Sequence, residues 1–404
     1  MNILYILRHN PWGIGGGCYA CRCYLDAFTE VFKGACMDVC ICKEYLNRNE
    51  NGLPFTVDGL PNKNKNESKN NGDGSFDFIG IEQRSKIEKV MSPITGLLHR
   101  FDGTARKLLK SKKYDYCIFD HNSIAGPLVG LCKQLGVKTI VINHNCEAEY
   151  YRDNYDRLHR MLFLHHVKRA EKQSYLGCDY NVFLTEEDRV LFAKLYGESK
   201  TQSIVTGCFE FKRNNNSNDN INLNGKERLR LVISGTIGNV QNMDGIRYFL
   251  DELLGYVPKG AEVVIAGKNP PDSLHSEIER LNQTSKYAQL TLIPNPADIK
   301  SIVNGCDIFL CPTRLGGGLK LRVMDGLRAG LPVIAHKVSA RGYSEFSKQR
   351  YLWSFDSKES FSNALCDIIR TINNNQLNRK SIKDFSKEQF SFENKVEMLK
   401  TAIV

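Results

Sequence analysis

Short runs rich in valine, isoleucine and leucine recur along the whole chain, and stretches with helical spacing of apolar residues separate most of them. Such continuous apolar runs predict strands buried on both faces. Strands that alternate with helices in this way form parallel, doubly wound sheets. The runs fall into two groups and so predict two sheets, one from 2–7, 38–42, 114–120, 138–143, 180–185 and 203–207, the other from 229–235, 262–267, 290–294, 307–311 and 332–336.

Polar segments mark the boundaries between these parts. The chain has 404 residues, which is enough for two domains with separate cores. The asparagine-rich segment 211–228 has few apolar residues and predicts a linker at 208–228. The polar segment 47–75 is predicted to be an insertion in the first domain. The tail from Ser391 carries its apolar residues on one helical face, so we expect it to dock onto a domain.

The formal charge of +10 predicts an acidic partner. Basic residues gather at 106–113 and 151–172, which both read as amphipathic helices. Such helices can rest on an anionic membrane surface, and solvated helix faces are the alternative. Nucleic acid is not expected, because no recognition motif is present. No apolar run has transmembrane length and the start, MNILYILRHNPWG, lacks signal-peptide features, which favours the cytoplasm, with peripheral membrane contact as a further expectation.

Fourteen cysteines are scattered along the chain. Without a compact framework they predict reduced, buried thiols rather than disulfides. The cluster of Cys18, Cys21 and Cys23 has no second pair at zinc-site spacing, so core packing is favoured over metal binding. His165 and His166 are neighbours on a predicted helix and point to different faces. We therefore expect no metal site.

Four loops follow predicted strands at the edge where parallel sheets bind ligands, namely 9–17, 144–152, 235–242 and 314–320. In the last of these, three consecutive glycines precede a predicted helix whose apolar residues begin at Leu319 and which ends near Gly330. Glycines before a helix N-terminus let an anion approach free backbone N–H groups, so a phosphate is predicted here. The glycines at 15–17 do not have the spacing of a dinucleotide-binding fingerprint.

These loops together resemble those of the GT-B-fold glycosyltransferases, in particular the retaining enzymes of glycosyltransferase family 4. The similar stretches are 235–249, 262–270 and 303–342 in the second half, with the glycines at 15–17 and the loop HNCEAEYYR in the first. The resemblance implies two Rossmann-like domains that face a cleft, an acceptor-side domain at 1–207, a nucleotide-sugar domain at 229–385, and a C-terminal helix at 386–404 that returns to the first domain.

The resemblance further implies a nucleotide-diphosphate sugar as donor, a glycan or lipid-linked acceptor, no cofactor, no divalent metal, and a role in cell-surface polysaccharide or glycolipid assembly. The diphosphate would lie on glycine N–H groups while Lys320 or Arg314 offsets its charge. The donor-binding set implied is Gly15, Gly16, Gly17, Gly235, Thr236, Asn242, Arg314, Gly316, Gly317, Gly318 and Leu319.

Four further residues are candidates for catalysis. Lys320 is the first of them, and Asp325 would bind ribose hydroxyls or form an i,i+3 ion pair with Arg322 or Arg328. His144 would bind a sugar hydroxyl or cap the following helix. Glu147 would position the acceptor or lie in solvent.

One position departs from the family pattern. The family has two glutamates eight residues apart, and the corresponding residues here are Gly317 and Asp325. The first acid usually addresses the transferred sugar. Its absence leaves three interpretations open: a transferase, a catalytically silent nucleotide-sugar-binding protein, and a nucleotide-sugar epimerase of the same fold.

Overall fold

The computed structural model describes residues 1–13, 16–46, 76–96, 99–211 and 228–404. The predicted insertion at 47–75 and most of the predicted linker lie outside these ranges. The chain divides into two compact units, one formed by Met1–Arg213 with Phe392–Val404 and the other by Asn214–Ser391. The cleft expected between two domains stays a prediction.

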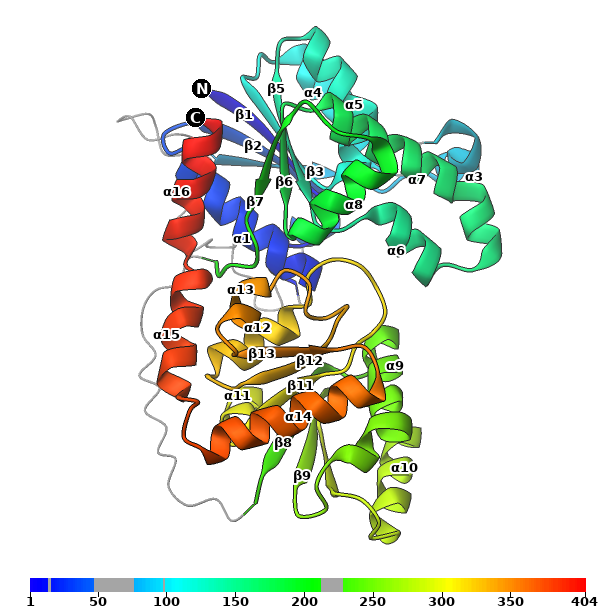
Figure 1. Ribbon diagram of the computed structural model, residues 1–404. Coiled ribbons are helices and arrows are strands. Elements are labelled where there is room, and N and C mark those ends of the chain that lie inside the picture. The colour runs from blue at the N-terminus through cyan, green and yellow to red at the C-terminus, as the bar shows by residue number, and fades with distance from the viewer. Residues whose placement is uncertain (14–15, 47–75, 97–98, 212–227) are drawn as a thin grey trace. The chain divides into compact units, whose positions relative to one another are not determined.

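The first unit is built on a seven-stranded parallel sheet with the order β3-β2-β1-β4-β5-β6-β7 (Figure 1). Its strands are β1 (Asn2–Leu7), β2 (Cys36–Cys42), β3 (Phe76–Ile81), β4 (Tyr116–Asp120), β5 (Lys138–Asn143), β6 (Tyr180–Phe183) and β7 (Gln202–Val205). All six predicted strands are present. β3 was missed because it follows the polar insertion directly and its residues are only partly buried.

Helices cover both faces of this sheet (Figure 1). They are α1 (Gly16–Val31), α2 (Lys43–Leu46), α3 (Lys86–Thr95), α4 (Phe101–Ser111), α5 (Asn122–Gln134), α6 (Glu147–Asn154), α7 (Arg157–Gly177), α8 (Glu186–Tyr196) and α16 (Phe392–Ile403). The predicted amphipathic stretch 151–172 is therefore two helices, because Asp156 caps the N-terminus of α7. The apolar side of α4 packs into the domain core.

The second unit has a six-stranded parallel sheet with the order β10-β9-β8-β11-β12-β13. Its strands are β8 (Arg230–Thr236), β9 (Glu262–Lys268), β10 (Gln289–Pro294), β11 (Ile308–Cys311), β12 (Val333–His336) and β13 (Leu352–Phe355). The five predicted strands are present. β13 was missed because it is only four residues long and partly exposed.

The helices of the second unit pack on both faces of its sheet, and residues 249–256 continue α9 as irregular helical turns. The helices are α9 (Val240–Tyr248), α10 (Asp272–Gln283), α11 (Ile299–Asn304), α12 (Leu321–Arg328), α13 (Ser344–Lys348), α14 (Lys358–Asn373) and α15 (Arg379–Gln389). The C-terminal tail passes from the second unit to the first between α15 and α16. The sequence had predicted that it returns to the first domain from residue 386. Ser386 in α15 donates a hydrogen bond to Leu327 O, and α16 packs against α1.

Candidate functional site

The strand order of the second sheet reverses between β8 and β11. β9 and β10 extend the sheet on one side of β8, and β12 and β13 extend it beyond β11 on the other. In open parallel sheets, ligands bind outside the carboxyl ends of the strands at such a switch point. The structure therefore brings together two of the four predicted loops, 235–242 and 314–320.

Asn242 ties these two loops to each other. Its Nδ2 donates a hydrogen bond to Thr236 O at 2.7 Å, and Thr313 Oγ1 donates to its Oδ1 at 3.4 Å. Gly235, the last residue but one of β8, has a φ of 150°, and a Cβ at this position would lie 2.8 Å from Arg322 Nε. Asn242 and Gly235 thus shape the site.

The loop after β11 needs glycine at two of its three glycine positions. Gly316 and Gly318 have φ values of 81° and 70°, a region that favours glycine. A Cβ on Gly316 would lie 2.4 Å from Gln241 Nε2. The spacing of apolar residues had predicted that Leu319 lies in the helix. α12 begins at Leu321, so Leu319 belongs to the loop instead. The C-terminal end agrees with the prediction, since Gly330 follows the helix with a φ of 76°.

Lys320 is the cation that lies on the glycine loop. Its Nζ donates hydrogen bonds to Gly317 O at 3.1 Å and to Gln241 Oε1 at 3.4 Å. Arg314 instead forms a two-pronged pair with Asp244 on α9, at 2.9 and 3.2 Å. Its guanidinium also lies 4.5 Å from the centre of the Tyr248 ring. Of the two cations, Lys320 is the one held beside the glycines.

Asp325 lies one turn into α12 and forms an ion pair. Arg322 Nη1 donates to Asp325 Oδ2 at 3.1 Å, which is the i,i+3 pair that the sequence allowed. Both side chains are partly exposed. A ribose would therefore compete with Arg322 for this carboxylate.

The first sheet has its own switch point, between β1 and β4. Polar side chains follow each strand there: Arg8 and His9 after β1, His121 after Asp120 of β4, and His144 and Glu147 after β5. The structure thus gathers the two predicted first-domain residues, His144 and Glu147, at one edge of the sheet.

Glu147 is buried in an ionic cluster. Arg8 Nη1 lies 3.3 Å from Glu147 Oε1 and 3.2 Å from His121 Nδ1. Burial alone would raise the pKa of Glu147, but the charge of Arg8 and the hydrogen bond with His121 hold that pKa well below its usual range. The alternative that Glu147 lies in solvent is wrong.

His144 is paired through Nε2 with the buried carboxylate of Asp120. It does not cap α6, because Cys146 is the N-cap residue of that helix. The His121 ring stacks on His144 with ring centres 4.6 Å apart. Burial, followed by the charge of Arg8, lowers the pKa of His121 to about 3, so His121 is neutral at physiological pH.

Arg8, Asp120 and His121 belong to this cluster and were missed in the sequence. Each lies at or directly after the carboxyl end of a predicted strand, which is the same signal that selected His144. In the first domain this signal selected the loops 9–17 and 144–152, but not the loop after β4. β4 adjoins β1 at the switch point, so the residues that follow β4 lie in the same cluster.

The first-domain glycines occupy a different setting from the one expected. Gly16 and Gly17 lie in the first turn of α1 rather than in an open loop, and Gly15 lies outside the described residues. A Cβ on Gly17 would lie 3.1 Å from the His9 ring. Gly17 therefore lets α1 begin close to the His9 ring.

All fourteen cysteines are free thiols, and eleven are buried. Cys23 packs in the core and donates a hydrogen bond to Phe209 O at 3.3 Å. Cys21, however, points to the switch point. One ligand atom each from Cys21, Asp120 and His144 lie within 4.8 Å of one another, which the expectation of no metal site did not foresee.

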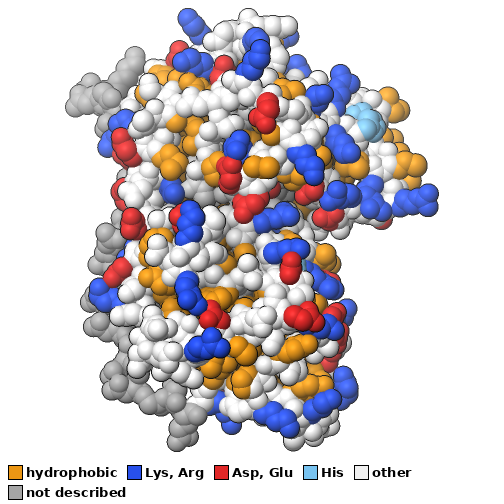
Figure 2. All heavy atoms as spheres, in the orientation of Figure 1, with side chains coloured by type: hydrophobic (Ala, Val, Ile, Leu, Met, Phe, Trp, Pro, Cys, Tyr) orange, Lys and Arg blue, Asp and Glu red, His pale blue; other side chains and the backbone are white. Residues whose placement is uncertain are grey.

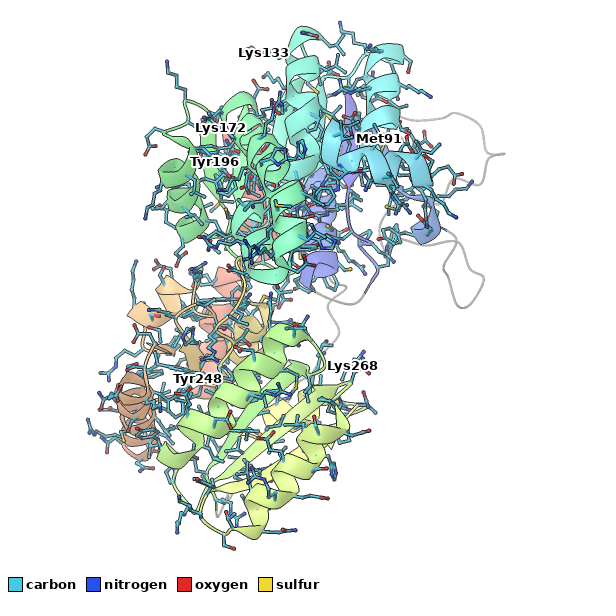
Figure 3. All side chains as sticks on the ribbon, turned by 90° about the vertical axis from the view of Figure 1, so that its right-hand side faces the viewer. Met91, Lys133, Lys172, Tyr196, Tyr248 and Lys268 are labelled. Carbon is cyan, nitrogen blue, oxygen red and sulfur yellow. The ribbon has the colours of Figure 1, made fainter. Side chains whose placement is uncertain are left out.

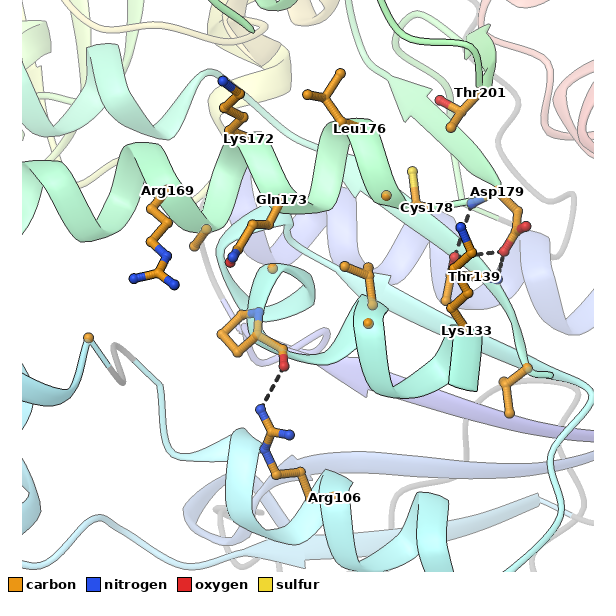
Figure 4. Close-up of a pocket in the computed structure, with 18 of the residues that line it drawn as sticks. Arg106, Lys133, Thr139, Arg169, Lys172, Gln173, Leu176, Cys178, Asp179 and Thr201 are labelled. Atoms are coloured by element: carbon orange, nitrogen blue, oxygen red, sulfur yellow. Dashed lines mark hydrogen bonds between the residues drawn. The ribbon is translucent and has the colours of Figure 1, made fainter. Parts of the chain in front are cut away.

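A basic groove lies at the opposite end of the first sheet (Figure 4). It runs between α5 and α7 toward the start of β5, and Arg106, Lys133, Lys138, Arg169 and Lys172 line it. Figure 3 shows Lys133 and Lys172 on the neighbouring helices α5 and α7. Asp179, which also lines the groove, accepts hydrogen bonds from Thr139 at 2.7 and 2.8 Å.

α3 presents its apolar face to solvent. Ile87, Val90 and Ile94 are 76%, 75% and 75% exposed, and Met91 on the same face is also exposed. Leu158 and Met161 of α7 are exposed as well. Figure 2 shows apolar and basic side chains intermixed over this part of the first unit.

Within the described ranges, no helix combines the length and apolar character that crossing a membrane requires.

Comparison with solved structures identifies the fold. The chain has the GT-B fold of two Rossmann-like domains. It is similar to sucrose-phosphate synthase of Thermosynechococcus elongatus, with a TM-score of 0.63, 14% identity, and 99% of this chain and 97% of that one covered. It is also similar to HepE of Anabaena, solved in complex with UDP, with a TM-score of 0.60, 10% identity, and 99% and 98% covered.

A third similar structure is WaaG, a glycosyltransferase involved in lipopolysaccharide biosynthesis, with a TM-score of 0.60, 13% identity, and 98% and 99% covered. Residues 230–371 match the family model described as Glycosyl transferases group 1. This segment contains every predicted donor residue of the second unit. A search among curated proteins finds no match. The resemblance to GT-B glycosyltransferases is thereby confirmed.

Proposed function

We propose that this protein transfers a sugar from a nucleotide-diphosphate sugar to an acceptor hydroxyl, with retention of anomeric configuration and without a divalent metal at the donor. The observation that carries this proposal is the glycine loop after β11, which lies beside the loop after β8 at the switch point of the second sheet. Both loops fall inside the segment that matches the glycosyltransferase family model.

The donor diphosphate is assigned to the backbone of Gly316, Gly317 and Gly318. Lys320 already contacts Gly317 O, so its ammonium group can stabilise charge on the departing phosphate without a large movement. Asp325 is assigned to the ribose, which would replace its ion pair with Arg322. HepE was solved in complex with UDP-glucose, which supports a nucleotide sugar as the donor class.

The acceptor side is assigned to the first domain. The Nε2 atom of His144 is occupied by Asp120, which leaves Nδ1 to bind a sugar hydroxyl. Glu147 is buried with Arg8 and His121 and has a lowered pKa, so it is a weak base. Its assigned role is to position Arg8 and His121.

The test is a thermal-shift screen with UDP, GDP and ADP and their hexose conjugates, since a ligand that binds the folded state raises its apparent stability. Turnover is then followed by release of free nucleotide, with and without a glycan acceptor. A transferase releases nucleotide and forms a glycoside. A silent binding protein shows the thermal shift without turnover, and an epimerase changes the sugar while the nucleotide stays attached.

Lys320→Ala should lower kcat more than it raises KM if the ammonium group acts mainly on the departing phosphate. Lys348→Ala is the matched control, because Lys348 pairs only with a neighbour on its own short helix, Glu345, among the described contacts. Equal effects of Lys320→Ala on kcat and KM would make Lys320 a ground-state contact.

We further propose that the acceptor is lipid-linked and that the enzyme works at the cytoplasmic face of a membrane, in polysaccharide or glycolipid assembly. The supporting observation is the outward apolar face of α3, which adjoins the basic groove at Ile94. Apolar side chains beside lysine and arginine suit an anionic lipid surface. The cations at 106–113 suit it less well, because Arg106 binds Asp102 and Lys112 binds Asp38.

A further inference from the structure

The group formed by Cys21, Asp120 and His144 has the composition of a transition-metal site. The three residues come from α1, the end of β4 and the loop after β5, and all three are buried. A thiolate, an imidazole and a carboxylate together suit zinc and similar ions, whereas magnesium and calcium prefer oxygen ligands alone.

The spacing of the three ligand atoms is close to what a metal ion needs. Metal–ligand bonds of about 2.0–2.3 Å place the ligands of a tetrahedral ion roughly 3.3–3.8 Å apart. The ligand atoms here lie within 4.8 Å of one another, and the closest pair, from His144 and Asp120, is in hydrogen-bond contact. Small side-chain rotations would therefore bring the three atoms to binding distance.

Two buried polar atoms at the site have no partner. Within the described part of the chain, neither Asp120 Oδ2 nor the Tyr5 hydroxyl forms a hydrogen bond. Buried polar groups are normally paired, and an unpaired carboxylate oxygen is costly. A hydrogen-bonded group without metal would use His144 Nε2 and the weakly donating thiol of Cys21.

We propose that Cys21, Asp120 and His144 bind one divalent metal ion of the zinc class in the first domain. When the metal binds, the Cys21 thiol releases its proton to solvent. His144 coordinates as a neutral imidazole through an unprotonated Nε2. The ion is separate from the donor diphosphate, which is assigned to the second domain. This proposal does not rest on transferase activity, because metal binding is measured on the resting protein.

Metal binding would also determine what His144 offers to a sugar. In the tautomer whose Nε2 carries the proton and donates a hydrogen bond to Asp120, Nδ1 is a hydrogen-bond acceptor. When Nε2 coordinates a metal, the proton must lie on Nδ1, which then becomes a donor. The ion would therefore fix the tautomer of a residue assigned to the acceptor side.

The experiment uses the full chain, treated with a chelator under reducing conditions and titrated with Co²⁺. We expect one Co²⁺ per chain, a thiolate-to-cobalt charge-transfer band, visible bands of tetrahedral intensity, and loss of all of them when Zn²⁺ is added. Cys21→Ser should abolish the charge-transfer band. Loss of a residue that only supports a metal ligand lowers metal affinity roughly 10- to 100-fold. Asp120→Asn and His144→Gln remove ligands themselves and should lower the affinity for Co²⁺ by more than this.

Cys18→Ser is the matched control, because Cys18 lies one turn earlier on α1 and outside the group. It should keep the bands. Circular dichroism checks that each variant is folded, and Asp120→Asn serves as the near-isosteric variant if Cys21→Ser unfolds. Absence of the charge-transfer band in the wild type, a band that survives in Cys21→Ser, or unchanged affinity in folded Asp120→Asn would overturn the proposal.

Discussion

In the glycine loop after β11, Gly316 combines a positive φ with a crowded Cβ position. Its φ is 81°, and a Cβ would lie 2.4 Å from the Gln241 amide, which also contacts Lys320. Gly318 also has a positive φ, whereas Gly317 between them does not. Backbone geometry, and not position within the glycine run, decides which glycine is required.

Gly316→Ala should therefore destabilise the second domain by about 1–3 kcal/mol and weaken nucleotide-sugar binding, because the backbone must strain or displace Gln241. Unfolding by denaturant and titration calorimetry measure the two effects. Gly260→Ala is the control in the same domain, since a Cβ there meets open space. A Gly316→Ala variant as stable as Gly260→Ala would contradict this prediction.

At the scale of elements, Glu171 of α7 joins four helices of the first domain. Its carboxylate accepts hydrogen bonds from the backbone N–H groups of Glu147 and Ala148, from Asn122 Nδ2 and from the Tyr196 hydroxyl, at 2.6–3.3 Å. α5, α6 and α8 are thus fixed to α7 through one buried side chain. Burial, opposed by the Tyr196 hydrogen bond, raises the pKa of Glu171 to about 7.

This raised pKa predicts a pH dependence of stability. Between about pH 4.5 and 7 the folded protein keeps a proton that the unfolded chain has lost, so the free energy of unfolding should fall as pH rises through this window. Glu171 should contribute a fall on the order of 3 kcal/mol, from 1.36 kcal/mol per pH unit. Denaturant unfolding at several pH values measures it.

Glu171→Gln should be less stable throughout, since its amide group faces backbone donors, but its stability should vary less with pH than that of the wild type. Glu187→Gln, on the exposed side of α8, is the control and should keep the wild-type slope. Equal slopes for wild type and Glu171→Gln would show that Glu171 does not titrate in this range.

At the scale of the whole molecule, the excess of positive charge and the apolar face of α3 define how the protein would meet a membrane. Each lysine or arginine near an anionic surface contributes about 1 kcal/mol, and salt screens this within about a Debye length. Inserted isoleucine and valine side chains contribute a part that salt does not screen. The two contributions can therefore be separated by experiment.

Binding to anionic vesicles should fall steeply with salt, while binding to neutral vesicles stays weak. Replacing Ile87, Val90 and Ile94 by serine should reduce vesicle binding at every salt concentration and leave donor turnover unchanged. Val190→Ser is the control, because Val190 is an exposed apolar residue on α8, away from this face. Co-sedimentation measures the binding. Equal binding of the triple variant and the wild type would favour a water-soluble acceptor.

The sequence alone determined the alternation of strands and helices, the two parallel sheets, and the loops at their carboxyl ends. These features depend on local periodicity, on glycine placement and on the boundaries of apolar runs, all of which are visible within a few residues. The glycosyltransferase resemblance follows from the same local segments. β3 was missed because most of its residues are not fully buried, and β13 because it is only four residues long and partly exposed.

Only the tertiary structure decided which distant side chains meet. Arg8 pairs with Glu147 across 139 residues of chain, and Asp120 meets both His144 and Cys21. The structure also decided that α4 buries its apolar face while α3 exposes its own. Periodicity shows that a helix has an apolar face, but the packing of the neighbouring elements determines whether core or solvent covers that face.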